Sequence, residues 1–182
     1  MPHMIEILSD LDILTRPVLD LSLLQLDGVP FGSDTRSFPR GKITDVTFSP
    51  IVHRYRAGTG VETEYFDAFG RALSLDEVID SVINSNGMLH FKDKISFKIV
   101  DGRVRGFAIF GDQLRHFDYI KSYDDCLAAF GPPSRTQMNE AYGDLMGYDI
   151  YYFGSKKHVG WDSFDNRVSL INLGDYEGNT GE

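Results

Sequence analysis

The chain has 182 residues, a formal net charge of −9 and a pI of about 4.9, with 42% hydrophobic and 25% charged residues. This length can bury the core of one domain or two small ones, and the composition is that of a globular protein. The acidic residues are spread along the chain, and such a field repels nucleic acid and anionic membranes while favouring basic partners. Many proteins are this acidic for solubility alone, so a basic partner is favoured but not required.

The sequence shows no targeting or membrane segment. No apolar run approaches the ~20 residues of a membrane span, and the N-terminus lacks the basic and then apolar order of a secretory signal. The single cysteine, Cys126, lies in the apolar-periodic stretch YDDCLAAF, where we expect it to fill the core. We therefore predict a cytoplasmic protein that forms a single compact domain over residues 1–182, with a flexible tail at 177–182.

The first seventy residues read mostly as short strands. Leucines alternate over residues 19–26 before Asp27-Gly28, which is the pattern of a strand that ends in a turn. Residues 33–42 carry Ser, Pro and Gly and predict a loop. Residues 43–66 predict a strand, a turn over residues 57–60 and a second strand, because β-branched and aromatic residues alternate with polar ones.

Two helices are predicted from their caps. Ser74 with Glu77 three residues later forms a capping-box pattern before an apolar helical spacing, and Asn86-Gly87 ends that segment. Ser122 opens a second helix that Gly131 stops, and Pro132-Pro133 prevents its resumption. Hairpin turns are predicted at Asp101-Gly102, Gly154-Ser155 and Asp165-Asn166.

Two stretches of the sequence resemble each other. SFKIVDGRVRGFAIFGD (96–112) and HVGWDSFDNRVSLINLGD (158–175) share Asp, then Gly or Asn, then Arg-Val, then an apolar run that closes on Gly-Asp. The repeat predicts a tandem duplication of a helix-plus-β-meander unit, over about 43–112 and 113–176. Independent use of the same hairpin chemistry is the alternative. Either way, we predict an α+β fold with antiparallel sheet and two short helices.

Motifs for catalysis, metals and cofactors are absent from the sequence. The five histidines lack ligand spacing, no Gly-x-Ser-x-Gly or phosphate-loop pattern occurs, and Asp162 to Asn166 lacks the Gly and Glu of a calcium loop. His158 is expected to be solvated or hydrogen-bonded, and Lys156-Lys157 forms a short basic pair at a turn. We therefore predict a protein that is not an enzyme and has no cofactor or metal.

The last third of the chain supplies the candidate binding residues. Tyr151 and Trp161 lie near Asp162 and Asp165, and exposed aromatics ringed by acids are typical of protein-binding patches. The alternative is that these aromatics fill the core of a thin sheet domain. Two further acids, Asp124 and Asp125, lie nearby in sequence at the start of the second helix, where they also complement the helix dipole.

The stretch SYDDCLAAFGPPS followed by GYDIYYFGSKKHVGWDSFDNRVSLI carries a family resemblance. A short helix that ends in Phe-Gly-x-Pro, a tyrosine-rich strand and an Arg-Val-x-x-Ile strand resemble the units of β-lactamase-inhibitor-like proteins and related outer-membrane assembly lipoproteins. The stretch also resembles small acidic immunity proteins of bacterial polymorphic toxin systems. The resemblance covers residues 122–174 and, in part, 74–112. The chain shows no signal peptide, lipobox cysteine or disulfide pair, which the secreted members would have. The resemblance therefore implies an acidic, cytoplasmic protein of the immunity type.

The resemblance implies a non-enzymatic immunity protein that neutralises a toxin by occlusion. Its partner would be a basic protein, held by Asp124, Asp125, Tyr151, Trp161, Asp162 and Asp165, with neither nucleic acid nor membrane involved. One alternative is a small enzyme or ligand-binding module with a site built from His53, Glu62, Glu64 and His90. Another is a homodimeric scaffold in which strand edges pair across a two-fold axis. The sequence leaves open whether the chain is a monomer or a homodimer.

Overall fold

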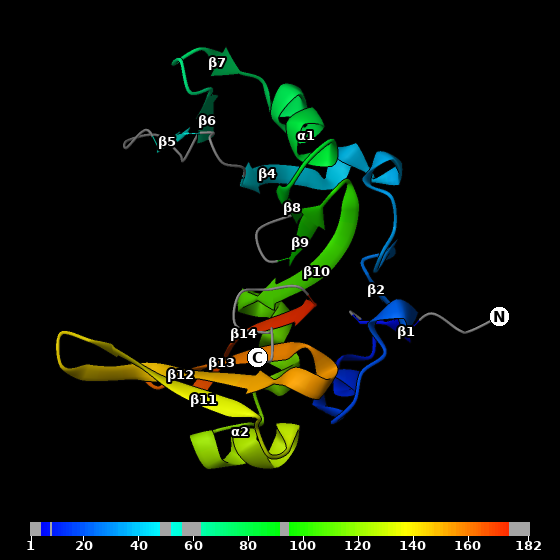
Figure 1. Cartoon of the computed structure of the whole chain (residues 1–182). Helices are drawn as coiled ribbons and strands as arrows, with labels where there is room; N and C mark the ends of the chain where they lie inside the picture. The colour runs from blue at the N-terminus through cyan, green and yellow to red at the C-terminus, as the bar shows by residue number, and fades with distance from the viewer. Residues whose placement is uncertain (1–4, 8, 48–51, 56–62, 92–94, 175–182) are drawn as a thin grey trace.

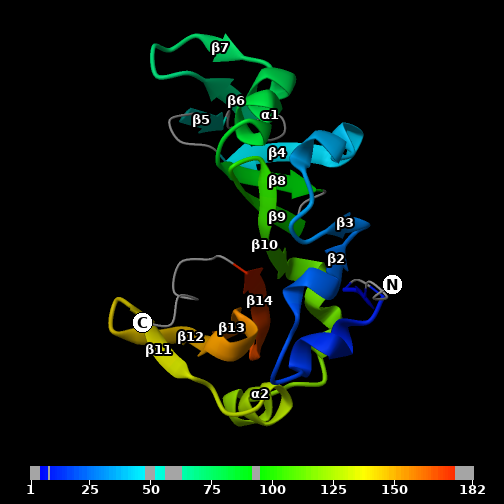
Figure 2. The same cartoon turned by 45° about the vertical axis from the view of Figure 1, so that its right-hand side comes forward.

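The computed structural model of the chain describes residues 5–7, 9–47, 52–55, 63–91 and 95–174. Over these residues the protein is an α+β fold, as predicted, built on one eight-stranded antiparallel sheet with two α-helices and two three-stranded sheets. The predicted turn at 57–60 and the predicted tail at 177–182 lie outside the described residues. Figures 1 and 2 show the large sheet twisting from β4 at one end to β11 at the other.

The large sheet has the strand order β11-β12-β13-β14-β10-β9-β8-β4. In chain order its strands are β4 (Ile43–Thr47), β8 (Gly87–Phe91), β9 (Ile95–Val100), β10 (Arg103–Phe110), β11 (Arg135–Ala141), β12 (Asp144–Tyr152), β13 (Lys157–Asp162) and β14 (Arg167–Gly174).

Two short-stranded sheets accompany it. One contains β1 (Ile5–Glu6), β2 (Leu24–Leu26) and β3 (Val29–Pro30), and the other contains β5 (Val52–Tyr55), β6 (Thr63–Phe66) and β7 (Ala72–Leu73). The predicted turn at Asp27-Gly28 joins β2 and β3, and both residues have positive φ angles, of 49° and 78°. Residues 33–42 hold short 3₁₀ turns and bury Thr35, which bonds to the carbonyl of Gly102 (2.8 Å), so the predicted loop packs on the sheet.

Both helices begin at the predicted caps. Helix α1 (Leu75–Ile83) follows Ser74, whose hydroxyl accepts from the Glu77 amide while the Glu77 carboxylate accepts from the Ser74 amide, a complete capping box. Helix α2 (Tyr123–Phe130) follows Ser122, which accepts from the amide of Asp125. It ends at Gly131 with a φ of 83°. Helix α1 lies near one end of the large sheet and α2 near the other (Figure 1).

The two similar stretches of sequence form neighbouring hairpins of the same sheet. Asp101-Gly102 turns β9 into β10 and Asp165-Asn166 turns β13 into β14, and β10 and β14 then pair antiparallel at the centre. This places the two units side by side, related by an approximate two-fold arrangement of their hairpins. Descent of the two units from a duplicated segment stays a prediction.

The large sheet has one apolar face, which carries the core. A transverse row of buried residues in register crosses five strands of that face: Ile95, Ile109, Ile171, Val159 and Ile150.

Aromatic contacts cover this apolar face from two sides. From the N-terminal part of the chain, Phe38 meets Phe97 edge-on at 5.2 Å between ring centroids. From α2, Tyr123 stacks on Tyr148 of β12 at 4.0 Å, and Cys126 fills the same region as a buried free thiol. Burial raises the pKa of this thiol to about 12, which keeps it protonated and unreactive at neutral pH.

The position of Lys157 differs from the predicted one, in which Lys156 and Lys157 form a basic pair at a turn. Lys156 occupies the turn with a left-handed φ of 48°, but Lys157 begins β13 with 0% of its surface exposed and points into the apolar face. Its Nζ donates to the carbonyls of Leu14 (2.6 Å) and Arg16 (3.1 Å) and lies over the Tyr152 ring. The side chain therefore anchors the N-terminal segment to the sheet.

Candidate functional site

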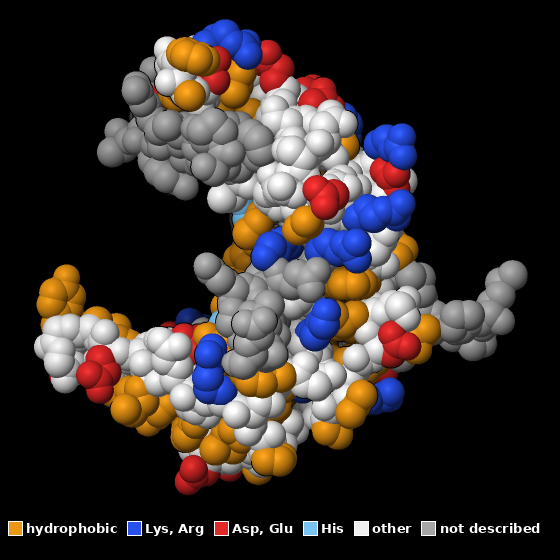
Figure 3. All heavy atoms as spheres, in the orientation of Figure 1, with side chains coloured by type: hydrophobic (Ala, Val, Ile, Leu, Met, Phe, Trp, Pro, Cys, Tyr) orange, Lys and Arg blue, Asp and Glu red, His pale blue; other side chains and the backbone are white. Residues whose placement is uncertain are grey.

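The opposite face of the large sheet is polar. Because side chains alternate between faces and paired residues share a face, the strand register defines a row that crosses seven strands. We call this set the polar row; it contains Arg135, Tyr151, His158, Asn172, Ala108, Ser96 and His90. Figure 3 shows the molecule hollowed between its two ends, with pale-blue histidine atoms visible at the hollow.

A hydrogen-bonded network joins four strands around His158. Asp149 accepts from His158 Nε2 (2.7 Å) and from the Asn139 amide (2.6 Å). On the other side of the ring, the Asn172 amide nitrogen lies 3.0 Å from His158 Nδ1. An amide nitrogen only donates, so Nδ1 accepts and Nε2 carries the proton in this arrangement. His158 is thereby fixed in one tautomer and one ring orientation.

Replacing Asp149 with alanine is expected to destabilise the protein by about 1–3 kcal/mol, because two donors lose their shared acceptor in a partly buried setting. Asp144→Ala on the same strand is the matched control, since that exposed side chain should change stability by less than about 0.5 kcal/mol. Urea unfolding of the two variants measures the difference. Equal midpoints would show that the network adds nothing to stability.

Tyr151 is sandwiched between two neighbours of the polar row. Its ring stacks on His158 with 4.7 Å between centroids and 16° between planes, and the Arg135 guanidinium lies 4.2 Å from its other face. Only 7% of Tyr151 is exposed. The sandwich fixes the direction of both the phenol and the guanidinium on the polar face.

His90 forms a second, separate cluster at the far end of the polar row. Its Nδ1 lies 2.7 Å from Ser96 Oγ and its Nε2 lies 2.8 Å from Thr47 Oγ1. Four strand spacings, or about 19 Å along the sheet, separate it from His158. The two histidines are therefore too far apart to act on one bond of a small substrate.

Three predicted contact residues line one cavity at the β11–β12 end of the large sheet. A cavity of about 400 Å³ at the β11–β12 end has Trp161, Asp162 and Asp165 in its wall, together with Asn139 and Phe164. Asn139 also belongs to the His158 network, so the cavity adjoins the polar row.

The acids of this cavity are held by local bonds. Asp162 Oδ1 accepts from the amides of Phe164 (2.8 Å) and Asp165 (3.1 Å), and Asp165 pairs with Arg167 at 2.7 Å. Asp162 therefore shapes the turn between β13 and β14, while Asp165 stays half exposed.

The other three predicted contacts do not line this cavity, and Trp161 is buried although it belongs to the cavity wall. Asp124 and Asp125 are exposed on the first turn of α2, which packs on the apolar face, so they do not line this cavity. Tyr151 and Trp161 are 7% and 3% exposed, and Trp161 pairs in register with Tyr148, which stacks on α2.

Sequence reasoning missed the apolar side chains that are exposed at this end. They are Met138, Tyr142, Leu145 and Met146 on the β11–β12 hairpin and Phe164 in the β13–β14 turn. We call these five residues the docking end. In Figure 3 hydrophobic atoms cover much of the arm that β11 and β12 form. The stretch MNEAYGDLM carries a partial signal, because Gly143 is a turn residue and Met138, Leu145 and Met146 lie on either side of it.

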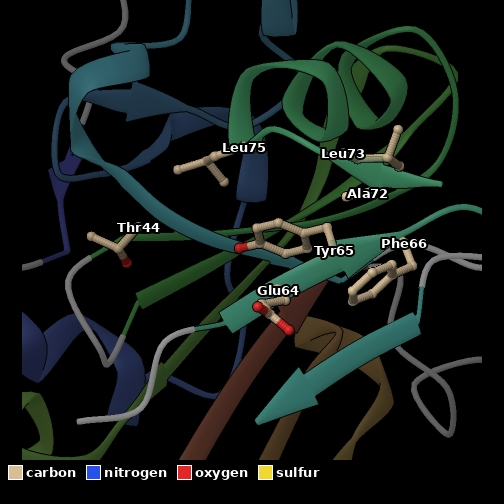
Figure 4. Close-up of a pocket in the computed structure, with 7 residues that line it drawn as sticks. All are labelled: Thr44, Glu64, Tyr65, Phe66, Ala72, Leu73 and Leu75. Atoms are coloured by element: carbon tan, nitrogen blue, oxygen red, sulfur yellow. The ribbon is translucent and has the colours of Figure 1, made fainter. Parts of the chain in front are cut away.

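A second cavity, of about 420 Å³, lies between β4, β6, β7 and the start of α1 (Figure 4). It contains Glu64, one of the residues considered for an alternative ligand site, and Tyr65, whose hydroxyl donates to Asp45 at 2.6 Å. His90 is not among the lining residues, and the side chains of His53 and Glu62 lie outside the described part of the chain. Within that part, this cavity brings no histidine to the carboxylate.

Within the described ranges, no group of three or more His, Cys, Asp and Glu residues is arranged to hold a metal ion. None of the helices described is long and apolar enough to cross a membrane. Comparison of the chain with models of known protein families, with curated proteins and with solved structures gives no match.

Proposed function

We propose that this chain is a non-enzymatic protein-binding protein of the immunity type, which neutralises a basic partner such as a bacterial toxin by occlusion. The observation that carries the proposal is the docking end, where large apolar side chains are exposed on the β11–β12 hairpin and in the β13–β14 turn. Phe164 is 66% exposed, Met138 is 60% exposed and Tyr142 is fully exposed. Large apolar side chains that are exposed together at one end of a protein are typical of an interaction surface.

Charge around the docking end favours a basic partner. Glu140 and Asp144 are exposed on the same hairpin, and Asp162 and Asp165 flank Phe164, whereas Arg167 is the basic residue of the β13–β14 turn. A surface with apolar anchors and an acidic rim steers a basic protein toward it and then holds it by burial. The net charge of −9 acts in the same direction at longer range.

The same charge disfavours the homodimer alternative. Strand β11 is an edge strand of the large sheet, so a second copy could in principle pair with it. Two copies would each bring a net charge of −9, which opposes their approach at low salt. The proposal therefore has the chain as a monomer before it meets its partner, which sedimentation at low salt tests.

The double variant Tyr142→Ser with Phe164→Ser is expected to weaken partner binding by about 100-fold, because two exposed apolar anchors are lost. Phe69→Ser is the matched control, since Phe69 is 97% exposed between β6 and β7, at the other end of the molecule. The proposal predicts that a toxin gene lies beside this one. Its product is the binding partner to use, and titration calorimetry at low and high salt gives the affinities.

Relief of that toxin's activity on co-expression would accompany binding, and the double variant should lose the relief while Phe69→Ser keeps it. Binding that high salt leaves unchanged would remove the electrostatic part of the proposal. Equal affinities for the wild type and the double variant, or no binding of the neighbouring gene product at low salt, would overturn it.

A further inference from the structure

Tyr151 is a buried residue whose hydroxyl makes no hydrogen bond with any described residue. Tyr151 is 7% exposed, and its recorded contacts are the ring stacking on His158 and the guanidinium of Arg135 over its other face. Buried hydroxyls are almost always bonded, so an unbonded one needs a specific explanation. A ligand oxygen that accepts from this hydroxyl supplies one.

Arg135 is the second unused group. Its guanidinium is exposed and lies over the rings of Tyr151 and Phe153, at 4.2 Å and 5.9 Å from their centroids. It makes no ion pair or hydrogen bond with any described carboxylate, although the chain carries 27 acidic residues. A guanidinium that lies over a ring still has its N–H groups available, and these can donate to two oxygens of one anion.

The nearest carboxylate is directed toward other donors. Asp149 lies on the same face two residues from Tyr151, but it already accepts from His158 and from Asn139. Asn172 lies on the other side of His158. Its amide nitrogen donates one hydrogen to His158 and has a second hydrogen that can donate elsewhere. Tyr151, Arg135 and Asn172 thus present three kinds of donor along one row of the polar face.

We propose that Arg135 and Tyr151, supported by His158 and Asn172, form a binding site for a small molecule that carries a carboxylate or phosphate group. Arg135 binds the oxyanion with its N–H groups and the Tyr151 hydroxyl donates to one of its oxygens. His158 positions the phenol by stacking. The site lies on the polar face, which is opposite the face covered by α2, and it uses none of the five residues of the docking end.

The test uses the full chain with ¹³C at the ζ carbon of its tyrosines, titrated with inorganic phosphate or with acetate against chloride at matched ionic strength. Tyr151→Phe identifies the Tyr151 resonance by its disappearance. One or both oxyanions should shift this resonance in a saturable way while chloride does not. A shift with phosphate alone assigns a phosphate ligand, and a shift with acetate alone assigns a carboxylate.

Calorimetry on variants completes the test. Arg135→Gln and Tyr151→Phe should each weaken binding by about tenfold or more, since each removes a hydrogen bond to a charged group. Arg167→Gln, an exposed arginine of the same sheet that pairs with Asp165, should leave the affinity within about twofold. The proposal is overturned if neither oxyanion moves the Tyr151 resonance, or if Arg167→Gln weakens binding as much as Arg135→Gln.

Discussion

Replacing Lys157 with alanine is expected to lower the free energy of unfolding by about 3 kcal/mol or more. The side chain is fully buried, and its Nζ donates to the carbonyls of Leu14 and Arg16 while lying over the rings of Phe130 and Tyr152. The substitution leaves carbonyls without a donor and opens a cavity between the N-terminal segment and the sheet. Urea unfolding measures the loss.

Lys157→Met separates packing from hydrogen bonding. Methionine restores most of the volume but no donor, so the variant should lie between the wild type and Lys157→Ala in stability. If both variants match the wild type, Lys157 does not anchor the N-terminal segment.

The contribution of Lys157 should also depend on pH. Burial lowers the pKa of its ammonium from 10.5 to about 8. Between these two values the unfolded chain holds a proton that the folded chain has released, so stability rises with pH across that window. As the pH is raised from below 8 toward 10, the free energy of unfolding of the wild type should therefore rise relative to that of Lys157→Met, by at most ~3 kcal/mol. A constant difference would mean that the folded protein leaves the pKa of this lysine unchanged.

Replacing Gly147 with alanine is expected to cost about 3 kcal/mol or more and to disorder the β11–β12 end of the sheet. A Cβ on Gly147 would collide with the carbonyl oxygen of Trp161 on the paired strand, and backbone atoms yield less easily than a flexible side chain. The strands β12 and β13 must separate to admit it, which breaks their ladder beside the cavity that holds Asp162.

Gly41→Ala is the matched control for this substitution. Open space surrounds the Cβ position there and the backbone φ is not positive, so stability should change by less than about 0.5 kcal/mol. Thermal unfolding of both variants makes the comparison. A Gly147→Ala protein that unfolds at the wild-type temperature would show that β12 and β13 adjust without cost.

Local chemistry made the helices and turns of this protein readable from its sequence. Ser74 with Glu77, Ser122 with Gly131, and Asp101-Gly102 each act through bonds or φ angles within a few residues, and each lies where it was predicted. The α+β class followed from the same signals, because two capped helices alternate with runs of short strands.

The candidate site could be predicted only in part. Trp161, Asp162 and Asp165 share a cavity because they surround one turn, which neighbours in sequence can specify. The sequence predicted only that His158 is solvated or hydrogen-bonded, whereas the structure gives its partner as Asp149, from the strand paired beside it. A period-2 pattern shows which residues share a face, but it does not give the register that brings two strands together.

By itself, the sequence of this protein determined its capped helices, its hairpin turns and its acidic charge, because those properties act within a few residues or over the whole chain. Only the tertiary structure decided that β10 lies beside β14, that Lys157 is buried, and that Arg135, Tyr151, His158 and Asn172 form one row. These features depend on pairing between strands far apart in the chain, and that pairing is set by the packing of the whole core rather than by any local signal.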